Sequence, residues 1–167
     1  LPIIAAPMDT VVNAFMLNTM SNHGACGVMH RYNTIYEQVS VMKRVKGTKA
    51  AAIGVTGDYL SRATKLVDAG VQIICVDVAH GHHSLMKNAL SVLKKQFENE
   101  VHIMAGNVAT LDGFNDLSDW GADSIRVGIG GGSICSTRIQ TGHGVPTLQS
   151  IIDCSKSDRG ALLIADG

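Results

Sequence analysis

The hydrophobic positions of the chain fall into short uninterrupted runs, separated by longer stretches in which apolar residues recur at helical spacing. Runs that are continuous, and that do not alternate with polar residues, are typical of strands buried on both faces of a parallel sheet. They occupy residues 2–6, 25–29, 50–55, 72–76, 102–105, 124–127 and 161–165. The pattern therefore predicts seven parallel strands, whose starts lie 22 to 37 residues apart.

The segments between these runs carry the start and stop signals of helices. Residues 34–37 (Thr-Ile-Tyr-Glu) predict a capping box, in which the threonine and glutamate side chains each accept a hydrogen bond from a free backbone N–H. Asp58 is expected to cap a helix that ends before Gly70, because glycine tolerates the left-handed backbone of a helix end. Further helices are indicated by the stripe Met86, Leu90, Leu93 and Phe97, and by Phe114 and Leu117 before Gly121.

Strands and helices thus alternate along the chain, which predicts an α/β protein. Two architectures compete, a doubly wound sheet and a (β/α)8 TIM barrel. Glycines and polar residues follow several different strands, at residues 8–10, 30–31, 77–83, 106–107 and 128–145. Since the ends of barrel strands converge on one face that carries the chemistry, this pattern favours the barrel. About seven of its eight strands are present, so the barrel is expected to be incomplete and the chain a fragment of a longer protein.

Composition narrows the classes of function. The chain of 167 residues has 14 basic and 14 acidic side chains, 46% apolar residues and 4% aromatic residues. A balanced charge and few aromatic rings argue against nucleic-acid binding. No apolar stretch approaches the roughly 20 residues of a membrane span. The protein is therefore expected to be a globular enzyme or binding protein with neither a nucleic-acid nor a membrane partner.

The four cysteines include no C-x-x-C pair, which argues against a zinc site. Without a signal-peptide pattern they are interpreted as reduced thiols of a cytoplasmic protein. Cys26 and Cys75 lie inside apolar runs and are expected to be buried and inert. His82 and His83 are expected to be solvated at a helix start.

The segment 126–138 (Arg-Val-Gly-Ile-Gly-Gly-Gly-Ser-Ile-Cys-Ser-Thr-Arg) is the most informative part of the chain. Its glycines allow the backbone to approach a ligand closely, with N–H groups for a phosphate or carbonyls for a cation. Cys135 follows, and the nearby Arg138 would favour its thiolate. A thiolate beside a phosphate site indicates covalent catalysis. On composition alone, a flexible turn with an incidental cysteine explains the segment equally well.

This segment resembles the active-site loop of the IMP dehydrogenase/GMP reductase family, whose usual form is G-x-G-P-G-S-[IV]-C-[TS]-T-R. Further segments are similar to other motifs of the family in the same order, at residues 2–11, 27–31, 77–81, 105–110 and 164–167. The resemblance covers essentially the whole chain. It implies one partial catalytic barrel over residues 1–167, without the paired regulatory CBS modules that many dehydrogenases carry.

The resemblance implies a chemistry for the loop. Cys135 would attack C2 of a purine nucleotide, and Thr137 would assist the step of the leaving group or the water. In the dehydrogenase, hydride passes from IMP to NAD and water hydrolyses the thioimidate to give XMP. In the reductase, ammonia leaves GMP and NADPH reduces the adduct to IMP. A covalent adduct divides one difficult step into two.

The resemblance also assigns binding roles. The residues implied for substrate are Met8 at the purine, Ser133 at the phosphate, Asp166 with Gly167 at the ribose, and Asn107, which with Arg126 supports the loop. Those implied for the nicotinamide cofactor, NAD or in the alternative NADP, are Asp77, Ala79 and Gly81. The carbonyls of Gly130, Gly132 and Cys135 are implied as ligands of a potassium ion. The family further implies a homotetramer.

Some features depart from the family pattern or leave its two enzymes open. Gly131 stands where the family usually has proline, which is expected to loosen the loop. The missing CBS insertion after Val45-Lys46 favours the reductase, whereas the spelling of several motifs favours the dehydrogenase. The family's flap and eighth strand would follow Gly167, so these residues alone are expected to have no steady turnover. A non-catalytic protein that binds purine nucleotides is the third hypothesis.

Overall fold

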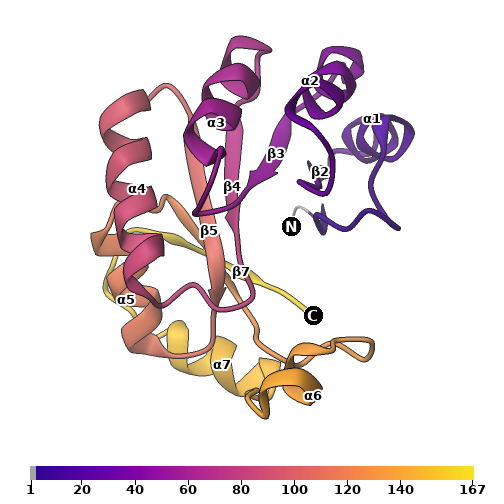
Figure 1. Ribbon diagram of the computed structural model, residues 1–167. Helices are drawn as coiled ribbons and strands as arrows, with labels where there is room; N and C mark the ends of the chain where they lie inside the picture. Colours follow the sequence, from indigo (N-terminus) through magenta and orange to yellow (C-terminus); the bar gives the residue numbers. More distant parts are fainter. Residues whose placement is uncertain (1–2) are drawn as a thin grey trace. The chain divides into compact units, whose positions relative to one another are not determined.

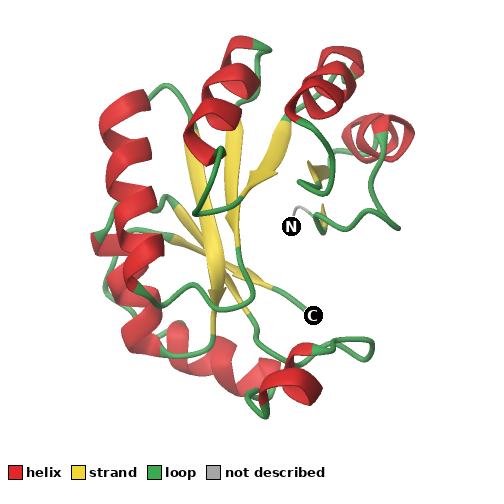
Figure 2. Cartoon of the chain, in the orientation of Figure 1, coloured by secondary structure: helices red, strands yellow, loops and turns green. Residues whose placement is uncertain are grey.

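Helices and strands alternate in the computed structural model, which describes residues 3–167 (Figures 1 and 2). The strands are β1 (Ile4–Ala5), β2 (Cys26–Met29), β3 (Ala50–Ile53), β4 (Ile73–Asp77), β5 (His102–Val108), β6 (Ser124–Val127) and β7 (Leu162–Ala165). The helices are α1 (Ala14–Asn22), α2 (Ile35–Arg44), α3 (Tyr59–Asp68), α4 (Ser84–Phe97), α5 (Leu111–Asp119), α6 (Thr137–Thr141) and α7 (Thr147–Cys154). The prediction of an α/β protein is confirmed.

The chain forms two compact units. The first comprises Leu1–Cys75 with Phe97–His102, and the second Val76–Gln96 with Ile103–Gly167. In the first unit β2 pairs in parallel with β1 and β3. In the second unit β6 pairs in parallel with β5 and β7. Each of these strands lies beside its neighbour in sequence, as in a (β/α)8 barrel, whereas a doubly wound sheet reverses its order. The strand order therefore supports the barrel.

The expectation of strands buried on both faces is met in the middle of the fold and fails at β7. Every residue of β3 and β6 is buried, but Leu162 at the start of β7 is 64% exposed. β7 stands at the end of the strand order and pairs with β6 alone among the described residues, so less of it is covered. The run at residues 2–6 forms only β1, and its first residue lies outside the described part.

The side-chain cap predicted for α2 is confirmed, and the one predicted for α3 is wrong. The backbone N–H of Glu37 donates to Thr34 Oγ1 at 3.2 Å, and that of Thr34 donates to Glu37 Oε2 at 2.8 Å, which completes the capping box. Asp58 precedes α3 but does not cap it, because its carboxylate turns to Arg62, 3.3 Å away. Gly70 has a φ of +86° and follows the end of α3 as expected.

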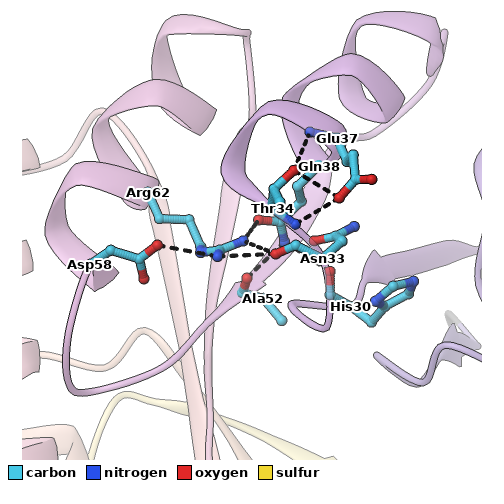
Figure 3. A network of polar contacts seen from close by, with 8 residues as sticks. All are labelled: His30, Asn33, Thr34, Glu37, Gln38, Ala52, Asp58 and Arg62. Carbon is cyan, nitrogen blue, oxygen red and sulfur yellow. Dashed lines mark hydrogen bonds and ion pairs between the residues drawn. The ribbon is translucent and has the colours of Figure 1, made fainter.

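A buried polar network joins α2 and α3 of the first unit (Figure 3). Gln38, which is fully buried, donates to the carbonyl oxygens of His30 and Ala52 at 3.0 and 2.8 Å. Its own Oε1 accepts a hydrogen bond from Arg62 at 2.9 Å. Arg62 also donates to the carbonyl of Asn33 from both terminal nitrogens at 3.1 Å. One glutamine thus satisfies two strand-end carbonyls and helps to hold a buried guanidinium.

Replacing Gln38 with leucine should destabilise the protein. The change removes the amide and leaves the part-buried carbonyl of His30, the buried carbonyl of Ala52 and one arm of Arg62 without this partner. Each unsatisfied buried polar group costs about 1–3 kcal/mol, so we expect a loss of at least that size in urea unfolding of the full-length protein. Gln149→Leu is the matched control, because Gln149 is exposed on α7 and bonds only Asp153 among the contacts described. Equal losses in both variants would contradict a special role for Gln38.

Candidate active site

An arginine inside a buried strand organises the polar end of the second unit. Arg126 of β6 is 9% exposed, and a charge buried in this way needs partners of opposite sign. Its Nη1 donates to Asp77 Oδ1 and its Nη2 to Asp166 Oδ2, both at 2.6 Å. Asp77 ends β4 and Asp166 follows β7, so the ends of three strands deliver the three side chains to one place. Two carboxylates predicted to bind riboses are thus held by the same guanidinium.

Asn107 connects this ion-pair cluster to the glycine-rich loop. The side-chain amide of Asn107, at the end of β5, donates to Asp166 Oδ2 at 2.6 Å and to the carbonyl oxygen of Gly128 at 2.8 Å. Gly128 has a φ of +152°, and a Cβ there would lie 2.1 Å from the carbonyl oxygen of Asp166. Only glycine permits this approach, so the loop starts in contact with the residue expected to bind the ribose.

The backbone of Gly167 lies beside the residue that precedes Ser133, which is expected at the phosphate. A Cβ added to Gly167 would lie 3.4 Å from the amide nitrogen of Gly132, so the two backbones are neighbours. Ser133 follows Gly132 and is exposed. Hydroxyl groups and free backbone N–H groups are the donors that proteins use to bind phosphate.

Cys135 lies in the same loop and is partly exposed. The pKa of Cys135 is lowered mainly by hydrogen bonds from the hydroxyl and the backbone of Thr137. The positive charge of Arg138 lowers it by a smaller amount. A thiolate stabilised by a hydroxyl and partly exposed is the form that acts as a nucleophile. Cys135 and Thr137 are therefore brought together in a chemically useful way.

The lowered pKa of Cys135 predicts selective alkylation. Burial raises the pKa values of Cys26 and Cys154, so these two thiols stay protonated to higher pH. Because only the thiolate reacts, iodoacetamide near neutral pH should label Cys135 first, with a midpoint below that of an ordinary cysteine thiol. Thr137→Val should move this midpoint upward. Peptide mass spectrometry across a pH series measures both, and labelling of Cys26 or Cys154 ahead of Cys135 would contradict the assignment.

Gly131, which departs from the family pattern, is explained by its neighbour Thr147. A Cβ at position 131 would lie 1.9 Å from Thr147 Oγ1, an atom that is buried and makes no hydrogen bond. A proline ring cannot occupy this space while Thr147 keeps its position. The expectation that Gly131 merely loosens the loop therefore missed a steric reason for it, since Thr147 comes from the start of α7.

The residues expected to meet the nicotinamide cofactor lie after β4. The N–H of Gly81 donates to the carbonyl of Asn107 at 2.6 Å, which places this loop beside the ion-pair cluster. Gly81 is buried, whereas Ala79 is exposed. His82 is not solvated as expected, because its Nε2 lies 2.8 Å from Asp116 Oδ2 and its ring lies 5.9 Å from that of Trp120.

Met8, predicted to line the purine, belongs to the first unit and is 36% exposed, so it is not among the residues gathered in the second unit. Cys26 is only partly buried, because its strand β2 begins there at the edge of the buried stretch.

The expected potassium site is occupied by a side chain. Arg138 donates hydrogen bonds to the carbonyl oxygens of Gly130 and Gly132, two of the three implied ligands. While Arg138 occupies this position, the two carbonyl oxygens cannot bind a metal ion in addition. The sequence showed Arg138 near Cys135, but it gave no sign that α6 turns the guanidinium back over the glycines.

Comparisons with known proteins show which family the chain belongs to. The model of the "IMP dehydrogenase / GMP reductase domain" matches residues 1–167. The chain belongs to the IMP dehydrogenase/GMP reductase family. An inosine-5'-monophosphate dehydrogenase of Nitrosopumilus maritimus is 42% identical over 137 residues, which are 81% of this chain and 29% of that protein. A GMP reductase of Leishmania major is 47% identical over 120 residues, 70% of this chain and 24% of that protein.

A solved structure supports the fold class. The crystal structure of inosine 5' monophosphate dehydrogenase from Legionella pneumophila matches with a TM-score of 0.90 and 47% identity, over 98% of this chain and 50% of that one. The expected incomplete (β/α)8 barrel is thereby confirmed. The chain spans about half of this solved structure and about a quarter of the curated relatives of the family. Among residues 3–167, no helix is both long and apolar enough to cross a membrane.

Proposed function

We propose that the protein containing this chain oxidises IMP to XMP with NAD. The observation that carries the proposal is the partly exposed Cys135, whose thiolate is favoured by Thr137 and whose loop starts at the cluster of Asp77, Arg126 and Asp166. A nucleotide-binding protein without chemistry needs the carboxylates and the phosphate cradle, but it does not need an activated thiol.

The reaction follows from the thiolate. Cys135 Sγ attacks C2 of IMP and forms an S–C2 bond, and the C2 hydrogen leaves as hydride with the electron pair of its bond. Water then attacks C2, the S–C2 bond breaks, and a proton is released to solvent. The net change is IMP, NAD⁺ and water to XMP, NADH and a proton, with the thiolate restored. Thr137 is within hydrogen-bonding reach of the sulfur and would assist the water step.

The remaining residues of the second unit would bind the nucleotides. Asp166 already accepts hydrogen bonds from Arg126 and Asn107, and a carboxylate has the capacity to accept ribose hydroxyls in addition. Ser133 would hold the phosphate, Gly167 would lie with Asp166 at the ribose, and Met8 of the first unit is expected from the family to line the purine. Asp77 with Ala79 and Gly81 fits a nicotinamide ribose, since the same capacity applies to a carboxylate held by Arg126. NAD supplies the acceptor for the hydride.

A second candidate is the NADPH-dependent reduction of GMP to IMP and ammonia. It is favoured by the relative from Leishmania major, which is named a GMP reductase and is as similar to this chain as several relatives named dehydrogenases. The shared covalent step at Cys135 serves both reactions. We further propose a cytoplasmic homotetramer, as an expectation from the family.

The direction of a nicotinamide signal separates these functions. The full-length protein is incubated with IMP and NAD, and separately with GMP and NADPH. The absorbance of reduced nicotinamide rises in the first mixture if the protein is a dehydrogenase, and falls in the second if it is a reductase. Binding of both nucleotides without either change would leave the non-catalytic hypothesis and reject the proposal.

A further inference from the structure

The side chain of Arg138 lies over the glycines that lead to Cys135. Its Nη1 donates to the carbonyl oxygens of both Gly130 and Gly132, the second at 2.7 Å. Both carbonyl oxygens thus accept hydrogen bonds from a positively charged group, the guanidinium of Arg138. Carbonyl oxygens that converge on one positive group are the usual arrangement for a hard monovalent or divalent ion, so the loop already holds a substitute for one.

The carbonyl of Gly132 has no remaining capacity for a metal ion. It also accepts a hydrogen bond from the backbone N–H of Cys135 at 3.1 Å. A carbonyl oxygen has two lone pairs, and both are used, one by Arg138 and one by the residue that carries the thiol. A metal ion on the same oxygens would also be repelled by the guanidinium. Arg138 and a metal ion therefore exclude each other here.

The backbone around Arg138 is built to bring it to this place. The short helix α6 starts at Thr137 and ends at Thr141. Gly142 follows with a φ of +70°, and its N–H donates to the carbonyl of Arg138 at 3.1 Å. The Cβ of Arg138 lies so close to Gly130 that a Cβ added there would be 3.3 Å away. Glycine at 130 and the turn at 142 thus let the arginine fold back over the start of its own loop.

We propose that the guanidinium of Arg138 takes the place of a potassium ion in this loop and positions Cys135 without metal. Arg138 is a positioning residue, since it acts on the sulfur through the carbonyl of Gly132 and the backbone of Cys135. The inference rests on the proposed function only in treating Cys135 as the reactive thiol. Its test reads alkylation, which needs no turnover, so the two proposals can fail separately.

The test compares two salts at equal ionic strength, potassium chloride and tetramethylammonium chloride, whose cation is too large for the carbonyls. The rate of iodoacetamide labelling at Cys135 at one fixed pH is measured in the full-length protein by peptide mass spectrometry. For the unsubstituted protein we expect the same rate, within twofold, in both salts. A tenfold slower reaction without potassium would overturn the proposal, because the carbonyls would then be binding metal and not Arg138.

The Arg138→Ala variant should behave differently. In tetramethylammonium its labelling rate at one fixed pH should fall about tenfold, because the contact that holds the loop is gone. Potassium should restore much of the rate, because the vacated carbonyls can then bind it. An unchanged rate, or a loss that potassium does not repair, would overturn the proposal.

Two further variants test whether the positive charge matters and whether loss of any surface arginine has the same effect. Arg138→Lys keeps the positive charge but lacks the planar fork, so it should lose less than Arg138→Ala and stay independent of potassium. A lysine variant as slow as the alanine variant would count against the charge as the acting feature. Arg159→Ala removes another exposed arginine of the second unit, which pairs with Asp119 and Asp158, and should leave labelling unchanged in both salts.

Discussion

Replacing Cys135 with alanine should remove the oxidation of IMP and leave nucleotide binding intact. The loop around Cys135 is held by the contact of Asn107 with Gly128 and by Arg138, neither of which involves the sulfur atom. Without the thiolate there is no bond to C2, and hydride would have to leave an unactivated purine. Loss of a covalent nucleophile lowers kcat by roughly 10⁴-fold or more, which turnover assays measure directly. Binding of IMP, measured by calorimetry, should change little.

Cys26→Ala is the matched control for this experiment. It makes the same chemical change at a partly exposed cysteine of β2, whose burial raises its pKa and keeps it protonated. It should keep the activity of the unsubstituted protein. If Cys135→Ala retains turnover, the covalent mechanism is wrong. If turnover is absent both before and after the substitution while IMP still binds, the non-catalytic hypothesis takes its place.

Local signals in the sequence were sufficient for much of the fold. The capping box at residues 34–37 needs only two side chains three positions apart, and it forms as expected. Asp58 has the same local signal, yet it fails because Arg62, one helical turn later, offers a stronger partner. Arg62 in turn is anchored by Gln38, which comes 24 residues earlier, so no local pattern could decide between a cap and an ion pair.

The candidate site likewise contains some contacts that the sequence could predict and others that it could not. Cys135 and Thr137 are two residues apart, and their hydrogen bond follows from the motif. The partners of Arg126 lie 49 and 40 residues away, so their meeting depends on the order of the strands. A signal was present, because a single arginine inside a buried apolar run requires a counter-charge and aspartates end two of the other strands. The contact of Thr147 with Gly131 left no such signal, since both residues look ordinary in sequence.

Replacing Arg126 with methionine should destabilise the protein more than any other substitution considered. Its side chain is 11% exposed, and those of Asp77 and Asp166 are 17% and 26% exposed. Removing the guanidinium leaves two carboxylates close together and largely shielded from water, with their main positive partner gone. Breaking a buried ion pair from one side costs about 3–5 kcal/mol, so the urea midpoint of the full-length protein should fall markedly.

Arg159→Met provides a contrast, because Arg159 also joins two carboxylates, those of Asp119 and Asp158, but on the exposed surface. Solvent screens such pairs, and the urea midpoint should stay close to that of the unsubstituted protein. Adding Asp77→Asn to Arg126→Met should recover part of the loss, since it removes one of the two uncompensated charges. If the double variant is less stable than Arg126→Met, the guanidinium acts mainly through packing, and the electrostatic account of this cluster is wrong.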